Sequence, residues 1–230
     1  DSKDIHRLAA RDRHVFAALM LAHGHGDGLV TGATRKSAHV LDQINHVFDA
    51  NAKGGATGIT ALLHKGRIVL IGDTLVHEWP DATDLANIAE SGARVARHLG
   101  LEPRVAFVSF STFGYPVSER AEKMHMAPRV LDERGVDFEY EGEMTVDVAL
   151  NAESQKNYPF SRLTGPANVL VVPARHSASI SVKLMQEMAG ATVIGPILTG
   201  LDKSIQIASS TSTTNDILNM AILAACKVGG

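Results

Sequence analysis

The chain has 230 residues, of which 45% are hydrophobic and 20% charged, with a formal net charge of −3. This composition excludes a disordered or fibrous protein, because it supplies enough apolar surface for a core. The nearly balanced charge gives no indication of a nucleic-acid or membrane partner. No stretch approaches 18 consecutive apolar residues, so no transmembrane helix is predicted. The single cysteine, Cys226, cannot form an internal disulfide, which favours a cytoplasmic protein.

Helical and strand patterns alternate along the chain, as is typical of an α/β protein with a largely parallel sheet. The predicted helices cover residues 5–23, 37–50, 84–99, 118–134, 144–150, 177–188 and 214–227. The predicted strands cover residues 28–32, 58–63, 67–72, 104–110, 138–140, 168–172, 192–198 and 204–208. The second and third strands are expected to form a hairpin. Residues 51–55 are predicted to be a linker and 151–166 a polar loop, and Pro128 is expected to kink or split its helix.

A hydroxyl-rich loop follows the strand over 104–110, where residues 109–116 read SFSTFGYP. Ligands of open α/β sheets bind outside the carboxyl ends of the strands. Backbone amides and hydroxyls at a helix N-terminus also favour anions. From the residues alone, the loop is either a binding loop or a turn that its own Ser and Thr side chains cap.

A second hydroxyl-rich loop, residues 209–214, precedes the last predicted helix. One of its residues must be the helix N-cap. The others form either a solvated loop or the wall of a phosphate or nucleotide pocket. Asp216 lies in the first helical turn, where a carboxylate is favourable to the helix dipole, so capping is its expected role on physical grounds.

Other candidate sites are weaker. His23 and His25 have metal-like spacing, but nothing supplies a fourth ligand, and no metal site is predicted. The glycines at 24, 26 and 28 follow a helix rather than a strand, so they are not a dinucleotide-binding motif. Cys226 is expected to be a buried, inert thiol.

Four segments resemble phosphotransacetylases, in the same order along the chain. They read GDGLVTGA at 26–33, EPRVAFVSFST at 102–112, GEMTVDVA at 142–149 and IGPILTGL at 194–201. RDRHVFAALM at 11–20 and SRLTGPANVL at 161–170 further resemble one branch of the family. That branch is the phosphotransacetylase-like domain that follows the catalytic half of large bacterial NADP-dependent malic enzymes.

The resemblance implies a fold of two α/β subdomains, each a three-layer sandwich as in isocitrate dehydrogenases, with a ligand cleft between them. The first subdomain is expected to cover residues 1–57 plus 204–230, and the second, inserted subdomain residues 58–203. The first would lack its N-terminal part, about a third of a full unit, so we expect the chain to be a piece of a longer polypeptide.

The resemblance also implies a binding site. Active members use an acidic base to take the CoA thiol proton and arginines to hold the phosphate. The expected ligand-binding residues are Ser109, Ser111, Thr112, Gly114, Ser209, Ser210 and Asp216. Asp216 matches the position of the base, but Ser210 and Asp42 occupy positions where the family has arginine, and Phe113 replaces a loop Lys or Gly. Losing two cations and gaining an anion weakens phosphate binding, so no catalytic residue is predicted.

The expected function is therefore that of a regulatory, catalytically silent domain with acetyl-CoA as its effector and no cofactor of its own. The parent enzyme would convert malate to pyruvate and CO2 with NADP and Mg²⁺ or Mn²⁺. The expected partners are a second copy of this domain and the malic-enzyme catalytic domain in the same chain. Two alternatives stay open: an active phosphate acetyltransferase, which joins acetyl-CoA and phosphate to give acetyl phosphate and CoA, and a purely structural oligomerisation domain.

Overall fold

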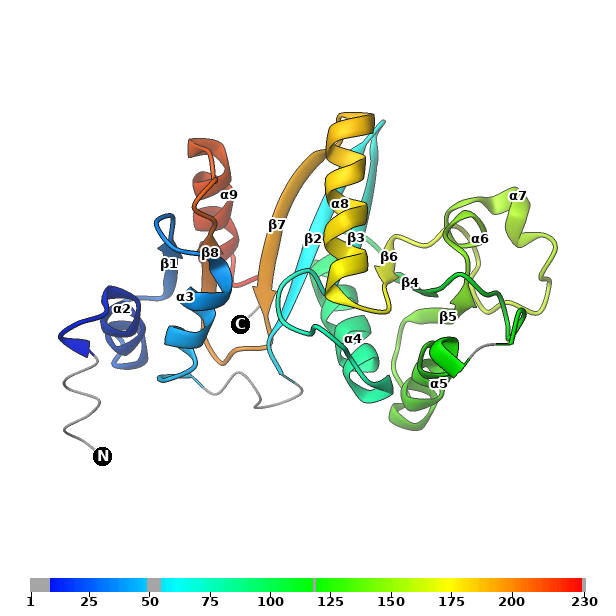
Figure 1. Ribbon diagram of the computed structural model, residues 1–230, viewed down its shortest axis with the longest axis horizontal. Coiled ribbons are helices and arrows are strands. Elements are labelled where there is room, and N and C mark those ends of the chain that lie inside the picture. The colour runs from blue at the N-terminus through cyan, green and yellow to red at the C-terminus, as the bar shows by residue number, and fades with distance from the viewer. Residues whose placement is uncertain (1–8, 49–54, 118, 229–230) are drawn as a thin grey trace. The chain divides into compact units, whose positions relative to one another are not determined.

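A computed structural model describes residues 9–48, 55–117 and 119–228, which form alternating helices and strands (Figure 1). The chain divides into two compact units. Unit 1 comprises Asp1–Gly58 and Ile194–Gly230, and unit 2 comprises Ile59–Val193. The sequence suggested boundaries at 57/58 and 203/204.

The secondary structure confirms the predicted α/β alternation. The helices are α2 (Arg13–Ala22), α3 (Ser37–Ile44), α4 (Ala82–His98), α5 (Glu119–Arg134), α6 (Val146–Leu150), α7 (Ala152–Gln155), α8 (Arg175–Ala189) and α9 (Thr214–Ala225). The strands are β1 (Gly28–Gly32), β2 (Thr57–His64), β3 (Arg67–Gly72), β4 (Arg104–Val108), β5 (Glu139–Met144), β6 (Val169–Val171), β7 (Thr192–Thr199) and β8 (Ser204–Ala208). Parts of the predicted first two helices and of the linker lie outside the described residues.

Two details differ from the sequence-based expectation. The short helix α7 lies inside the segment that was expected to be a polar loop, and the side chain of Asn151 caps it. Pro128 does not split α5, which runs continuously from Glu119 to Arg134. Met124, Ala127 and Leu131 are fully buried on either side of the proline, so tertiary packing compensates for the missing backbone hydrogen bond.

The larger sheet has the strand order β5-β4-β6-β3-β2-β7. β3, β6, β4 and β5 run parallel to one another, whereas β2 is antiparallel to β3, which confirms the predicted hairpin. The parallel strands place their carboxyl ends at one edge of the sheet. That edge carries the loops that follow β3, β4, β5 and β6.

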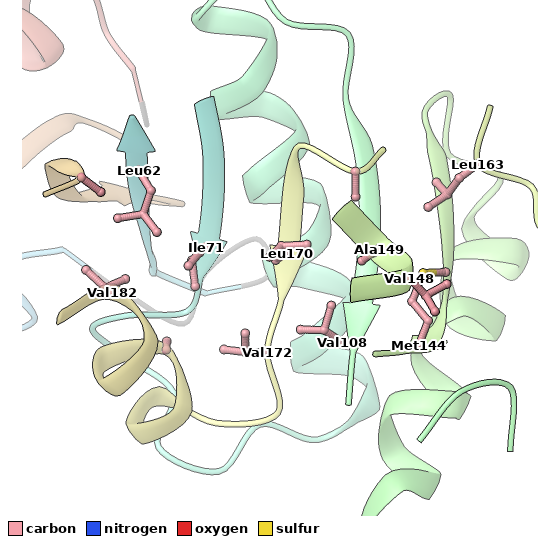
Figure 2. Packing of buried hydrophobic residues seen from close by; sticks show 14 residues of the cluster. Leu62, Ile71, Val108, Met144, Val148, Ala149, Leu163, Leu170, Val172 and Val182 are labelled. Carbon is pink, nitrogen blue, oxygen red and sulfur yellow. The ribbon is translucent and has the colours of Figure 1, made fainter. Parts of the chain in front are cut away.

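Strand β6, in the middle of this sheet, is covered by helices on both faces. On one face, a Cβ added at Gly92 of α4 would lie 2.5 Å from Val169 Cγ1, so glycine allows the close approach of helix and strand. On the other face, Leu170 belongs to a buried cluster with Val148 of α6 and Val182 of α8, as Figure 2 shows. Unit 2 therefore has the layered arrangement of an α/β domain.

Unit 1 contains the parallel pair β1 and β8, with Gly28 opposite Ser204 and Gly32 opposite Ala208. Gly32 has φ +111°, and a Cβ there would lie 2.2 Å from the carbonyl oxygen of Ala208, so only glycine fits. The segments after Gly32 and after Ala208 therefore start side by side. Among the described residues, no helix has the length and apolar character needed to cross a membrane.

Candidate functional site

A pocket of 1210 Å³ lies in unit 2 at the carboxyl ends of β4 and β6. Ser109 and Phe110 line it from the loop after β4, and Val172, Pro173 and Ala174 line it from the segment after β6. Residues of α5, α8, the first residues of α4 and α6, and the segment before α4 complete the wall. This is the position at which open α/β sheets bind ligands.

Aromatic and cationic side chains form one side of the pocket. Trp79 is 71% exposed and Phe110 is 61% exposed, although both are large apolar groups. The ring of His176 packs against Trp79 with a centroid distance of 5.1 Å. Lys123 Nζ lies 6.0 Å from the centroid of the Trp79 ring and donates to the carbonyl oxygens of Pro80 and Pro173, each at 3.1 Å.

The first turn of α8 also faces this pocket through Ala174, His176 and Ser177. Ala174 is the N-cap and has no polar side chain with which to bond the first backbone amides. The first turn contains no acidic residue. The amides and the positive end of the helix dipole are therefore available to a negatively charged group.

The loop over 109–116 is organised around a carboxylate that the sequence analysis missed. Glu143, near the end of β5, is 1% exposed. Its Oε1 accepts hydrogen bonds from Ser111 Oγ at 2.9 Å and from the Gly114 amide at 2.8 Å, and its Oε2 lies 3.1 Å from His125 Nδ1. Because the donors belong to the loop, Glu143 holds the loop in one conformation.

The four residues predicted for this loop therefore have different roles. Ser109 lines the pocket. Ser111 and Gly114 donate to Glu143, and Thr112 Oγ1 accepts from the Thr145 amide at 3.2 Å. These three residues shape the loop rather than line the pocket.

A second buried carboxylate, Asp73, supports the loop that carries Trp79. Asp73 directly follows β3 and is 2% exposed. It accepts hydrogen bonds from the amides of Leu75, Val76 and His77 at 2.7, 3.1 and 2.8 Å. His77 Nδ1 lies 2.7 Å from Asp73 Oδ2, and this hydrogen bond raises the pKa of His77 above its ordinary value of 6.5. The sequence signal that could have indicated Asp73 is an acidic residue immediately after an apolar strand.

In unit 1, the loop over 209–214 is bonded mainly to itself and to α9. Thr213 is the N-cap, and it forms a reciprocal capping box with Asp216. The Thr213 amide donates to Asp216 Oδ2 at 2.8 Å, and the Asp216 amide donates to Thr213 Oγ1 at 3.2 Å. Ser209 Oγ lies 3.1 Å from Thr211 Oγ1, whereas Ser210 and Asp42 are exposed. The capping role that the residues indicated for Asp216 is the one observed.

Within the described ranges, no group of three or more His, Cys, Asp or Glu side chains is placed to hold a metal ion. Cys226 is exposed rather than buried, because it follows the last residue of α9 as its C-cap. His14 is buried, with Nδ1 2.7 Å from Thr31 Oγ1, and burial lowers its pKa below 6.5.

Comparison with known proteins confirms the family resemblance. Residues 2–225 match the family model described as phosphate acetyl/butaryl transferase. The chain is 50% identical over 227 residues to an NADP-dependent malic enzyme of Rhizobium meliloti, and this match covers 99% of the chain but 30% of that enzyme. A phosphate acetyltransferase of Bacillus subtilis is 30% identical, over 96% of the chain and 69% of the enzyme.

Solved structures agree with these sequence matches. A phosphotransacetylase from Streptococcus pyogenes superimposes with a TM-score of 0.88 at 27% identity, covering 95% of the chain and 68% of that structure. The EutD phosphotransacetylase from Staphylococcus aureus superimposes with a TM-score of 0.84 at 26% identity, covering 94% and 67%. The α/β fold, the ordered motifs and the family match lead to one conclusion: the chain belongs to the phosphate acetyl/butaryl transferase family.

Proposed function

We propose that this chain is a regulatory domain of an NADP-dependent malic enzyme that binds acetyl-CoA but does not transfer the acetyl group to phosphate. The observation that carries the proposal is the substitution of cations at the family's phosphate-binding positions. By resemblance to the family, Ser210 and Asp42 stand at the two arginine positions, and both are exposed. A carboxylate at a phosphate-binding position repels the phosphate, and the charge that develops during acetyl transfer lacks its cationic partners.

The engagement of Asp216 supports the same proposal. This residue stands at the position of the family's base, yet its carboxylate accepts hydrogen bonds from both the amide and the hydroxyl of Thr213. Both hydrogen bonds engage Asp216 Oδ2 in the cap of α9.

The pocket in unit 2 supports the binding of a CoA ester. Its volume of 1210 Å³ suits a large ligand, since small-molecule sites commonly measure about 300–1,000 Å³. Its aromatic side chains can contact apolar or ring-shaped parts of the ligand. Lys123 and the start of α8 supply positive charge for phosphates.

The malic-enzyme context rests on the relatives. The chain spans 30% of the length of the Rhizobium meliloti enzyme and 30% of the probable NADP-dependent malic enzyme of Rickettsia prowazekii. In this proposal, acetyl-CoA is the effector, and NADP and Mg²⁺ or Mn²⁺ bind to the catalytic domain in the same cytoplasmic chain. A second copy of the domain is the other partner. Coupling between two binding sites is reciprocal. If acetyl-CoA changes the affinity for malate by some factor, malate must therefore change the affinity for acetyl-CoA by the same factor.

An active phosphate acetyltransferase is the second candidate function. It is favoured by the 30% identity to the Bacillus subtilis phosphate acetyltransferase and by the retention of Ser209 and Asp216 at motif positions. The two candidates differ in one measurable property, the conversion of acetyl phosphate and CoA into acetyl-CoA and phosphate.

Two measurements on the full chain test the proposal. Isothermal calorimetry should detect acetyl-CoA binding, and a thioester absorbance assay with acetyl phosphate and CoA should give no enzymatic turnover. Turnover at about 1 s⁻¹ or faster, the lower end of ordinary enzymes, would establish the acetyltransferase instead. Absence of acetyl-CoA binding would leave a purely structural role. The double variant Ser210→Arg and Asp42→Arg is the matched control, since restored cations should raise the affinity for inorganic phosphate.

A further inference from the structure

The position of Trp79 is unusual for a large apolar side chain. It is 71% exposed and lies on the wall of the 1210 Å³ pocket. Contiguous exposed apolar surface at a concave site commonly marks a place where a ligand covers it. Phe110, 61% exposed on the same pocket, enlarges this aromatic surface.

The segment that carries Trp79 is fixed at several points. At the start of the segment, Asp73 accepts hydrogen bonds from the backbone amides of Leu75, Val76 and His77. Arg175 Nη1 donates to the Leu75 carbonyl oxygen at 3.1 Å in the same part of the segment. Lys123 Nζ donates to the Pro80 carbonyl oxygen at 3.1 Å at its end. A ring held on a tethered segment loses little conformational freedom when a ligand stacks on it.

A second ring and a cation accompany the indole. The His176 ring lies 5.1 Å from the Trp79 ring at an interplanar angle of 59°, so the imidazole packs at a tilt against the indole. Lys123 Nζ is 6.0 Å from the Trp79 centroid. An ammonium has three donors, and the carbonyl oxygens of Pro80 and Pro173 use two of them, which leaves one for a ligand.

We infer that Trp79, with His176 packed against it, forms a stacking platform for a purine base, with Lys123 directed at a phosphate of the same nucleotide. Flat aromatic side chains stack on any base through its π-face, and a neighbouring cation adds attraction to the phosphate. The inference rests on the proposed function, because acetyl-CoA carries such a group, its 3′-phosphorylated ADP end. The platform then places the nucleotide end of the effector in unit 2.

Intrinsic fluorescence gives a direct readout, because Trp79 is the one tryptophan of the chain. The full chain is titrated with adenosine 3′,5′-bisphosphate, with acetyl-CoA and with S-acetylpantetheine, which lacks the nucleotide. We expect the first two ligands to quench Trp79 and the third to leave its emission unchanged. Lys123→Met should weaken the bisphosphate several-fold and leave adenosine unchanged, and an equal loss for both would remove Lys123 from the phosphate role.

Substitution of the platform provides the affinity test by calorimetry. Trp79→Ala should weaken both adenosine 3′,5′-bisphosphate and acetyl-CoA about tenfold or more, because base–aromatic stacking contributes that much on alanine substitution. Trp79→Phe keeps an aromatic face and should recover most of the affinity. Met188→Ala is the matched control, since Met188 is 79% exposed on the same helix as His176 and does not line the pocket.

The outcomes separate this inference from the proposed function. The platform is overturned, and the proposed function stands, if acetyl-CoA binds the wild type and Trp79→Ala with equal affinity and does not quench the Trp79 emission of the wild type. If the bisphosphate binds at Trp79 but acetyl-CoA does not bind, the platform stands and the proposed function falls. Quenching by S-acetylpantetheine, with loss of its binding in Trp79→Ala, assigns the platform to the acyl arm and overturns the inference. Absence of binding by all three ligands overturns both.

Discussion

The two hydroxyl-rich loops read alike in the sequence but are held in different ways. In unit 2, the loop over 109–116 closes around Glu143, a carboxylate 1% exposed that accepts from Ser111 and Gly114. In unit 1, the loop over 209–214 bonds within itself and to α9, and its carboxylate partner, Asp216, belongs to a surface capping box. The first loop is therefore anchored to the core and the second to a helix end.

This difference shows what a run of Ser and Thr leaves undetermined. A hydroxyl can face a ligand, a neighbouring backbone or a buried charge, and the choice depends on groups distant in the sequence. Glu143 lies 32 residues from Ser111, so no local pattern links them. In unit 2 the buried acid uses the hydroxyl of Ser111 and the amide of Gly114, which leaves Ser109 and Phe110 on the pocket.

The largest expected effect on this comparison comes from Glu143→Ala. The substitution leaves the Ser111 hydroxyl and the Gly114 amide without their buried acceptor, and it removes the partner of His125. We expect the free energy of unfolding to fall by about 3 kcal/mol, since each unsatisfied buried group costs about 1–3 kcal/mol. Urea denaturation with a check that the m-value is unchanged provides the measurement.

Glu143→Gln is the control for that prediction. The amide oxygen can still accept from Ser111 and Gly114, so the loss of stability should be smaller than for the alanine variant. A Glu143→Ala protein within about 0.5 kcal/mol of the wild type, the usual range for surface substitutions, would show that the buried acid does not anchor the loop.

An intermediate effect is expected from Thr213→Ala in the second loop. The substitution removes the hydroxyl that caps the Asp216 amide and bonds the Asp216 carboxylate, so stability should fall by about 1 kcal/mol. The exposed Ser210 supplies the matched control, because Ser210→Ala should change stability by less than about 0.5 kcal/mol. Equal losses for the two variants in urea denaturation would contradict the anchoring of this loop through the helix cap.

Most of the fold was predictable because it depends on local patterns. Alternating and continuous apolar runs indicated the strands, and the helix over 84–99 was predicted from its apolar face and observed as α4. The continuity of α5 through Pro128 was not predictable, since it depends on burial of Met124 and Leu131 against other elements. Tertiary packing overrode a local rule there.

The site was predictable only in part. The position of the first loop after a buried strand led to Ser109, which lines the pocket. Trp79, Lys123 and His176 come from three separate segments, and only the parallel arrangement of the strands brings those segments to one edge of the sheet. The periodicity of apolar residues in the sequence does not reveal which side chains from such distant segments come into contact. Physical chemistry alone did identify the capping role of Asp216, because both of its partners are local.

The smallest expected effects concern pH, and they have opposite signs in the two units. The hydrogen bond that His77 donates to Asp73 raises the pKa of His77 above 6.5, so this stabilisation is fully present below about pH 6.5 and is lost as the pH rises through the folded-state pKa. Burial lowers the pKa of His14, so its contribution is present above about pH 6.5 and is lost as the pH falls through its folded-state value. The advantage of the wild type over His77→Asn should therefore shrink on the alkaline side. The advantage of the wild type over His14→Gln should shrink on the acidic side. Both advantages are differences in the free energy of unfolding, measured between pH 5 and 8.5. Parallel pH profiles for the two variants would mean that the environments of the two histidines do not differ as their contacts indicate.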